Sequence, residues 1–254
     1  MSTRPYILNE ITWKTTHKTK YEVAILPWGS TEPHNFHLPY SADTIQSEYI
    51  AGESARIAWE KGANVIVLPT IPIGVNSGHL NLNMTLNINP STQLALLRDV
   101  IYSIQRHGIS KFLIINGHGG NDFKPLIREL KLEFENIFIG LINWYQADKG
   151  YDFFDEPGEH GGEMETSNLL VIKPELVLPL SDAGEGIEKK SKLTGLKEGW
   201  VWTPRDWKRI SDDTGLGNPK KATKEKGEAY LKSLTEKIGG FIYDLAVTKI
   251  EEIY

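Results

Sequence analysis

Short apolar runs alternate with longer amphipathic segments along the first 145 residues. The apolar runs cover residues 23–28, 64–68, 111–116 and 137–143, and each is bounded by glycine, proline or polar residues. Helical periodicity fills the intervals, over residues 45–63, from Asn89-Pro90 to about 107, and from about 122 to 135. This alternation predicts a single-domain three-layer α/β/α fold over residues 1–254, with a mainly parallel sheet covered by helices.

The regular pattern ends after Tyr145. Residues 148–158 are predicted as a loop, residues 162–172 as a helix, and residues 222–252 as a long amphipathic terminal helix. Residues 173–219 are rich in Pro, Gly, Asp and Trp and show little periodicity. Because a stretch of this length without regular structure is uncommon unless it is functional, we expect it to cover the domain or line the site.

Composition narrows the class of protein. Hydrophobic residues make up 40% and charged residues 24% of the chain, as in soluble enzymes. The net charge of −5 argues against a nucleic-acid partner, which needs a basic face. The chain has no cysteine, which excludes disulfides and thiolate metal ligands. Without a signal-peptide pattern or an apolar run of about 18 residues, we expect a cytoplasmic protein with no membrane partner.

Polar clusters follow the predicted strands, at the edge where parallel α/β sheets bind ligands. Residues 29–43 (GSTEPHNFHLPYSAD) follow the first strand, and His79 follows the second. His118 follows the third, and Trp144 with Tyr145 follows the fourth. The sequence therefore places its candidate chemistry along one edge of the sheet.

The segment 29–43 contains Glu32, His34, His37 and Asp43. Imidazole and carboxylate together suit Zn, Mn or Fe. Any one of these residues alone could belong to a surface loop whose histidines cap turns. Four together, beside His118 in the segment NGHGGN, favour a metal site. A turn that binds an anion at a helix N-terminus is the alternative for NGHGGN.

A third cluster is EHGGEMETS, residues 159–167. His160 could act as a base and Glu159 as the carboxylate that orients it. If a helix begins at residue 162, Glu163 and Ser167 share one face and Glu165 points elsewhere.

The three segments, in this order and spacing, resemble the creatininase family of creatinine amidohydrolase relatives, as does the tail DDTGLGNPKKATKEKGEAYL. The resemblance implies an amidohydrolase that uses two divalent cations (Zn, Mn or Fe) to activate water against a small amide, often in a homo-oligomer of six chains. Matched by position, Glu32 and His118 would bind one cation and His34 the other. Asp43 would bridge them, and His160 would be the base, oriented by Glu159.

Two departures from the creatininases proper affect the substrate. Those enzymes carry a Tyr-Glu pair after the motif histidine, where this chain has Gly119 and Gly120. We expect Glu163 to replace the missing ligand, with Glu165 as the competing candidate. The segment after His79 also lacks the family's Gly-Thr. Both departures argue against creatinine itself. A formamide hydrolase of cofactor biosynthesis, a peptidase that trims short peptides, and a member that binds metal or ligand without turnover remain alternatives.

Overall fold

The computed structural model describes residues 3–254, and its centre is a parallel sheet. Within these residues the strands are β1 (Val23–Trp28), β2 (Val65–Val67), β3 (Lys111–Asn116) and β4 (Phe138–Asn143). Their order is β2-β1-β3-β4, and every neighbouring pair is parallel. The predicted α/β fold with a parallel sheet is confirmed. The connection from β1 leads to one side of the sheet, to β2, and the following connection leads to the other side, to β3 and β4. Such a topological switch point between β1 and β3 leaves a crevice at the carboxyl ends of the strands.

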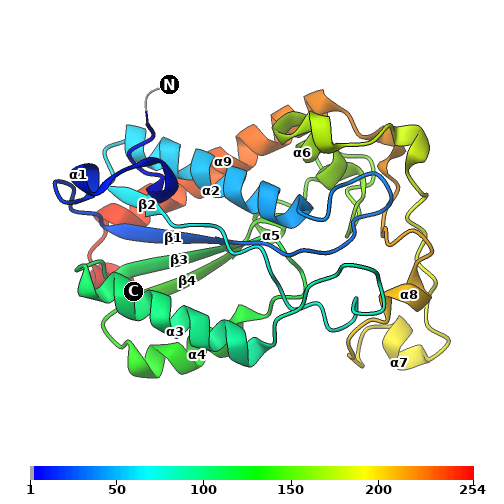
Figure 1. The fold of residues 1–254 in the computed structure, drawn as a ribbon, viewed down its shortest axis with the longest axis horizontal. Coiled ribbons are helices and arrows are strands. Elements are labelled where there is room, and N and C mark those ends of the chain that lie inside the picture. The colour runs from blue at the N-terminus through cyan, green and yellow to red at the C-terminus, as the bar shows by residue number, and fades with distance from the viewer. Residues whose placement is uncertain (1–2) are drawn as a thin grey trace.

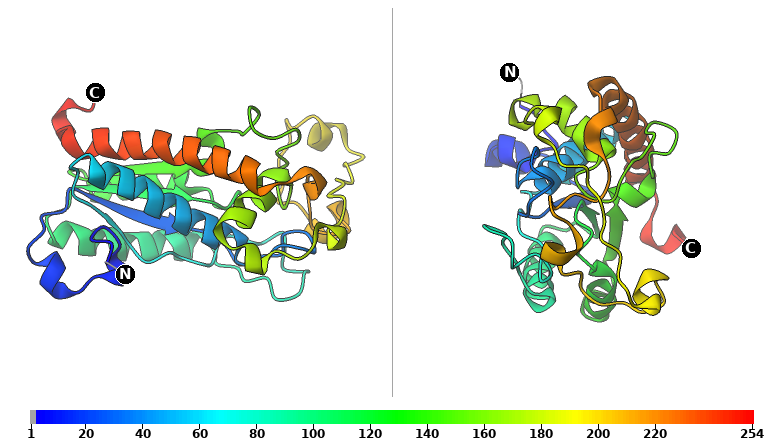
Figure 2. Two further views of the ribbon diagram at one scale, coloured as in Figure 1. Left: turned by 90° about the horizontal axis from the view of Figure 1, so that it is seen from above. Right: turned by 90° about the vertical axis from the view of Figure 1, so that its right-hand side faces the viewer.

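Helices cover both faces of this sheet (Figure 1). One face carries α2 (Ala42–Glu60), α6 (Glu163–Ile172) and α9 (Lys224–Val247), and the other carries α3 (Pro90–Arg106) and α4 (Phe123–Glu133). The long helices α2 and α9 lie side by side (Figure 2), and they share an extensive contact. The fold is therefore a three-layer sandwich.

The strands are continuous apolar runs because both of their faces are buried. Along β1, Val23 and Ile25 pack in the core beneath α2 and α9, whereas Ala24 and Leu26 pack in the core against α3 and α4. This alternation is the period of two expected for a strand. Burial of each large aliphatic side chain stabilises the fold by about 1.5–3 kcal/mol.

Several helix boundaries differ from prediction by a few residues, and two of these differences place side chains. Helix α2 begins at Ala42 and not at residue 45, so Asp43 lies in its first turn, where a carboxylate is stabilised by the helix dipole. Helix α9 ends at Val247, where the Lys111 ammonium donates hydrogen bonds to the carbonyls of Ala246 and Thr248. That side chain satisfies carbonyl groups that the helix leaves free.

Residues 173–219 contain only short helical turns within the described chain, as their lack of periodicity predicts. They extend along the carboxyl end of the sheet, where α7 and α8 lie (Figure 1). Among residues 3–254, no helix is both long and apolar enough to cross a membrane. The short helical elements are η1 (Leu8–Glu10), α1 (Trp13–Thr16), α5 (Trp144–Ala147), η2 (Pro174–Leu176), η3 (Leu180–Asp182), α7 (Thr194–Lys197), α8 (Trp207–Ile210), η4 (Pro219–Lys221) and η5 (Ile250–Glu252).

Candidate metal centre

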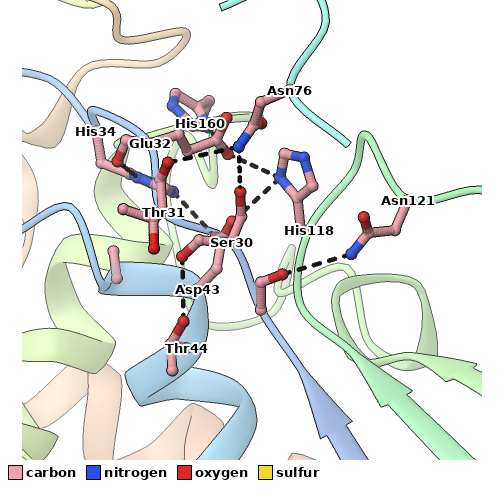
Figure 3. A network of polar contacts seen from close by, with 12 residues as sticks. Ser30, Thr31, Glu32, His34, Asp43, Thr44, Asn76, His118, Asn121 and His160 are labelled. Carbon is pink, nitrogen blue, oxygen red and sulfur yellow. Dashed lines mark hydrogen bonds and ion pairs between the residues drawn. The ribbon is translucent and has the colours of Figure 1, made fainter. Parts of the chain in front are cut away.

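The segment after β1 and the first turn of α2 bring Glu32, His34 and Asp43 together (Figure 3). All three are almost completely buried. His34 donates from Nδ1 to the backbone carbonyl of Glu32 at 3.1 Å, and its Nε2 lies 3.0 Å from Asp43 Oδ1. The carbonyl therefore fixes the ring so that Nε2 faces the carboxylate.

The turn after β3 adds His118 from the opposite side. Its Nδ1 lies 2.7 Å from Glu32 Oε1 and 3.1 Å from Asp43 Oδ2. Its Nε2 donates to the carbonyl of Val75 at 3.0 Å, which again fixes the ring. Gly120 permits this arrangement, because a Cβ there would lie 2.4 Å from His118 Nε2. This clash explains why position 120 cannot carry the glutamate of the creatininase pair.

Helix α6 supplies Glu165 and not Glu163. Glu165 Oε1 lies 3.9 Å from His34 Nε2, and the carboxylate accepts hydrogen bonds from Gly161 N and Gln46 Nε2. Glu163 is also buried, but it pairs with Lys226 and accepts a hydrogen bond from Glu156 N at 2.8 Å. The expectation that Glu163 joins the cluster is therefore wrong, because a lysine of α9 occupies its carboxylate. Its competitor Glu165 reaches the cluster.

His160 lies over the cluster, and its ring stacks on His34 with centroids 4.0 Å apart. It donates from Nε2 to the carbonyl of Pro33 at 2.8 Å, so its unprotonated Nδ1 faces Glu32 Oε1 at 3.9 Å. Glu159 does not orient this ring as expected. Its exposed carboxylate pairs with Arg205 at 2.8 Å, since the side chains of residues 159 and 160 point to opposite sides.

Three groups of side chains bring donor atoms within 4.8 Å of one another: Glu32, Asp43 and His118; His34, Asp43 and Glu165; and Glu32, His34 and His160. Asp43 belongs to the first two groups, and Oδ1 faces His34 while Oδ2 faces His118. Glu32 Oε2 and Asp43 Oδ2 are buried without a hydrogen-bond partner among the described residues. Buried carboxylate oxygens are normally satisfied, so these orphaned atoms fit a cation. Carboxylates with imidazoles suit Zn or Mn.

The carboxylates control the protonation of the cluster. Burial alone would lower the pKa of His34, but Asp43 and Glu165 raise it to about 10. Burial would also lower the pKa of His118, but the charges and hydrogen bonds of Glu32 and Asp43 raise it well above its usual value. Burial and the neighbouring His34 charge hold the pKa of His160 well below its usual value. Without metal, His34 and His118 are therefore protonated beside the carboxylates at neutral pH, and His160 stays neutral.

Two further residues, His79 and Trp207, lie against this cluster. His79, noted only for following the second strand, places Nε2 3.1 Å from Glu32 Oε2. Trp207 of α8 stacks on His79 with centroids 4.2 Å apart and lies 4.6 Å from His160. The histidine after a strand was an available signal for His79. No periodic signal exists for Trp207, which was one of several tryptophans in an irregular segment.

His37 and four aromatic residues near the sheet edge occupy different places. His37 bonds Thr166 Oγ1 at 2.8 Å, which secures the first turn of α6 beside Glu165. Trp144 is core, with 1% exposure, and Trp200 is exposed. Tyr145 and Trp202 line a cavity of about 320 Å³ together with Gly119 and Gly120. Of the two glycines that replace the Tyr-Glu pair, a Cβ at Gly119 would therefore meet open space, whereas one at Gly120 would clash with the carbonyl oxygen of Val75 and with His118.

Comparison with known proteins places this site in a family. The creatininase (creatinine amidohydrolase) family model matches residues 9–242. A crystal structure from Bacteroides fragilis, of a protein proposed to be a creatinine amidohydrolase, has 39% identity and a TM-score of 0.93. The match covers 98% of this chain and 99% of that one. Structures of a mutant creatininase of a zinc–zinc type and of a manganese creatininase share the fold, each with a TM-score of 0.79, at 22% and 21% identity respectively.

The relatives of this chain include a creatinine amidohydrolase and a peptidase. Creatinine amidohydrolase of Pseudomonas putida is 24% identical over 265 residues, which cover 92% of this chain and 95% of that protein. The mycofactocin precursor peptide peptidase of Mycolicibacterium smegmatis is 27% identical over 215 residues, which cover 81% of this chain and 78% of that protein. With the family model spanning nearly its whole length, the chain belongs to the creatininase family of metal-dependent amidohydrolases.

Proposed function

We propose that this protein hydrolyses a C–N bond of a small amide at a centre of two divalent cations. Glu32, Asp43 and His118 would hold one cation, and His34, Asp43 and Glu165 the other. The observation that carries this proposal is the position of Asp43, whose two carboxylate oxygens face different histidines from within a buried helix turn. A bridging carboxylate needs that arrangement.

The residues around the centre support a hydrolytic reaction. Divalent cations supply Lewis-acid polarisation of a carbonyl and lower the pKa of water. His160 would accept the proton of the attacking water at Nδ1, because its Nε2 proton is engaged by Pro33. It would then deliver that proton to the leaving nitrogen. Its depressed pKa keeps the imidazole in the basic form that this step requires.

The substrate class within this reaction is a small amide other than creatinine. Gly119 and Gly120 remove the side chains that creatininases carry at this place, and the cavity of about 320 Å³ beside them has room for a longer substrate. This cavity favours a second candidate, the trimming of a short peptide, for which the family contains the peptidase described above. Formamides form the third class. Turnover of formamides, cyclic amides and short peptides, compared in one screen, separates the three classes.

Self-association is part of this proposal. Several large apolar side chains on the segments near the sheet's carboxyl edge are exposed, including Phe36, Leu80, Met84, Trp200 and Trp202. Exposed large apolar side chains are buried when chains associate, so these residues are candidates for a subunit interface. A homo-oligomer, with six chains as the resemblance implies, should appear in light scattering after gel filtration. A monomer at micromolar concentration would contradict this part of the proposal.

The metal content of wild type and Asp43→Ala tests the central claim. We expect about two Zn, Mn or Fe ions per wild-type chain, as in two-metal hydrolases. Loss of the bridging carboxylate should remove both the ions and amide turnover. Asp99→Ala, which removes an exposed carboxylate from α3, is the matched control and should keep both. A wild type that stays metal-free after reconstitution would leave a protein that binds a ligand without turnover. Activity that survives Asp43→Ala would refute the bridging role.

A further inference from the structure

Asp213 is a buried carboxylate that the hydrolytic reaction does not use. Its Oδ2 accepts a hydrogen bond from Gly186 N at 2.8 Å, and its Oδ1 accepts hydrogen bonds from Ser211 Oγ and Gly215 N, each at 2.9 Å. Burial of a carboxylate is costly unless hydrogen bonds replace its contacts with water, and here three neutral donors do so. Gly186 and Ser211 flank residues 187–210 on either side. Asp213 therefore joins the two ends of that segment.

The turn that begins at Asp213 leads directly to the backbone of His160. The hydrogen bond from Gly215 N to Asp213 Oδ1 spans the turn, and Thr214 inside it has a left-handed backbone with φ of 63°. A residue other than glycine keeps that conformation only when surrounding contacts enforce it. Leu216 follows, and its N donates to the His160 carbonyl at 2.8 Å while His160 N donates back to the Leu216 carbonyl at 3.1 Å. The Asp213 turn thus sets the position of the His160 backbone.

The same carboxylate also supports a residue that contacts the His160 ring. Ser211, which donates to Asp213, donates from its backbone N to the carbonyl of Trp207 at 3.3 Å. The Trp207 ring lies 4.6 Å from the His160 ring, which in turn stacks on His34 at 4.0 Å. The ring is therefore packed between neighbours, one of which depends on the contacts of Asp213.

A third connection runs to the loop that accepts the His160 hydrogen bond. Asn35 Oδ1 accepts from Gly184 N at 2.8 Å, and Asn35 Nδ2 donates to the Gly184 carbonyl at 3.2 Å. Gly184 packs against Asp213, since a Cβ there would lie 2.1 Å from Asp213 Oδ2. Pro33, two residues before Asn35, accepts the Nε2 hydrogen bond of His160 at 2.8 Å. The contacts from Asp213 to His160 therefore form a closed circuit.

The geometry points to Asp213 as a positioning residue for His160, which it holds against the proposed centre through Leu216 on one path and through Ser211 and Trp207 on the other. This inference rests on the proposed function, since it takes His160 as the group that moves the proton. A base must lie within hydrogen-bond reach of the water it deprotonates. Misplacement of a reacting group by about 1 Å can cost 100-fold in rate. Loss of this support should therefore slow the chemical step and leave substrate and metal binding intact.

Asp213→Asn tests the inference, with Asp212→Asn as the matched control. The amide nitrogen cannot accept a hydrogen bond, so the N–H of Gly186 or Gly215 loses its partner. We expect kcat for the best amide substrate to fall about 10–100-fold, with KM and metal content within about twofold of wild type. Asp212 is the adjacent residue, but its side chain is 81% exposed and pairs with Lys189, so its variant should match wild type. An unchanged kcat in folded Asp213→Asn would refute the inference.

A double-mutant cycle with His160→Gln separates positioning from general damage to the fold. If Asp213 acts through His160, Asp213→Asn should lower the residual kcat of His160→Gln by less than about twofold. A further loss as large as in the wild-type background would mean that Asp213 supports the fold as a whole, and the inference would be wrong.

The His160 Nε2 proton gives a readout that needs neither metal nor turnover. Because it is buried and donated to Pro33, it should exchange slowly with water and give a resolved NMR signal in the metal-free protein, which is absent from His160→Gln. We expect exchange at least about tenfold faster in Asp213→Asn and unchanged in Asp212→Asn. Equal exchange in wild type and Asp213→Asn would refute the inference. Faster exchange, in a protein that neither binds metal nor turns over amides, would refute the proposed function and keep the contact path from Asp213 to His160.

A second variant keeps the inference testable if Asp213→Asn does not fold, which circular dichroism would show. Ser211→Ala removes one of the three donors to the carboxylate and leaves the other two. We expect kcat to fall about threefold or more at unchanged KM, together with faster exchange of the His160 proton. A folded Ser211→Ala variant that matches wild type in both quantities would then refute the inference.

Discussion

The two faces of the first turn of α6 carry one buried glutamate each, and the two have different partners. Glu163 faces α9, where Lys226 pairs with its carboxylate. Glu165 faces the opposite way, towards His34, and is held by Gly161 N and Gln46. Both side chains are less than 10% exposed. Burial alone therefore does not identify a metal ligand.

The two glutamates differ in the positively charged residue that pairs with each carboxylate. A buried carboxylate must be paired with a positive charge, and a lysine keeps its charge at neutral pH. The ion pair of Glu163 with Lys226 therefore connects α6 to α9. Ser167, on the same face of α6, accepts a hydrogen bond from Thr223 N. Glu165 lies instead beside a histidine, and a metal cation can displace the proton of that histidine. The face of α6 that carries Glu165 is therefore the one that can contribute to a metal site.

The largest expected effect comes from Glu165→Gln. The amide keeps the shape but removes the negative charge at the His34 end, so we expect one of the two cations to be lost and kcat/KM for the best amide substrate to fall at least about 100-fold. Elemental analysis and initial rates measure both quantities. Full activity with two ions bound would mean that Glu165 is not a ligand.

The second effect concerns pH and the same histidine. With a pKa of about 10, His34 is protonated at pH 7 in the metal-free protein, and a cation must displace that proton. Affinity for the cation at the His34 end should therefore rise with pH, by up to about tenfold per unit while one proton is released. Competition titrations at pH 6.5, 7.5 and 8.5 measure the slope.

Glu165→Gln should flatten this slope, because Glu165 is one of the charges that raise the pKa of His34. The metal-free protein should show the converse dependence in its stability. A folded-state pKa above the unfolded value of about 6.5 contributes stability below that pH, and the contribution is lost as the pH rises through about 10. Metal affinity independent of pH in wild type would contradict the assigned proton.

Glu163→Gln should have a smaller effect of a different kind. The change leaves the Lys226 ammonium without its buried partner, and we expect the free energy of unfolding to fall by about 1–3 kcal/mol. Metal content and kcat/KM of the folded protein should stay within about twofold of wild type. Urea unfolding monitored by circular dichroism gives the first quantity. Loss of metal in Glu163→Gln would reverse the assignment of the two faces.

The comparison also shows which features could be predicted from the sequence. The four strands were predictable because each is a short apolar run buried on both faces. The positions of Glu32, His34 and His118 were predictable because these residues follow strands at one edge of the sheet. The phase of α6 was predictable too, since Glu163 and Ser167 do share a face. Which face meets the cluster depends on Lys226, 63 residues further along the chain, and no local pattern contains that information.

Two other features were hidden for the same reason. His79 reaches Glu32 only because the segment carrying Trp207 packs on it, and that segment has no periodicity from which its path could be derived. Asp43 was expected in a loop, but the helix begins one residue before it. Contacts between distant segments, and not local propensity, decide these details.

The smallest expected effect comes from a second adjacent pair, Glu159 and His160. Glu159 was expected to orient His160, but its side chain is 67% exposed and pairs with Arg205. Exposed ion pairs contribute about 0–1 kcal/mol, so Glu159→Gln should change stability by no more than that. Because Pro33 holds the His160 ring, the pH dependence of kcat/KM should also stay unchanged. A shifted acidic limb in Glu159→Gln would show that this carboxylate acts on His160 during turnover after all. His160→Gln, by contrast, should abolish that limb together with most of the activity, since the group that titrates there is the imidazole itself.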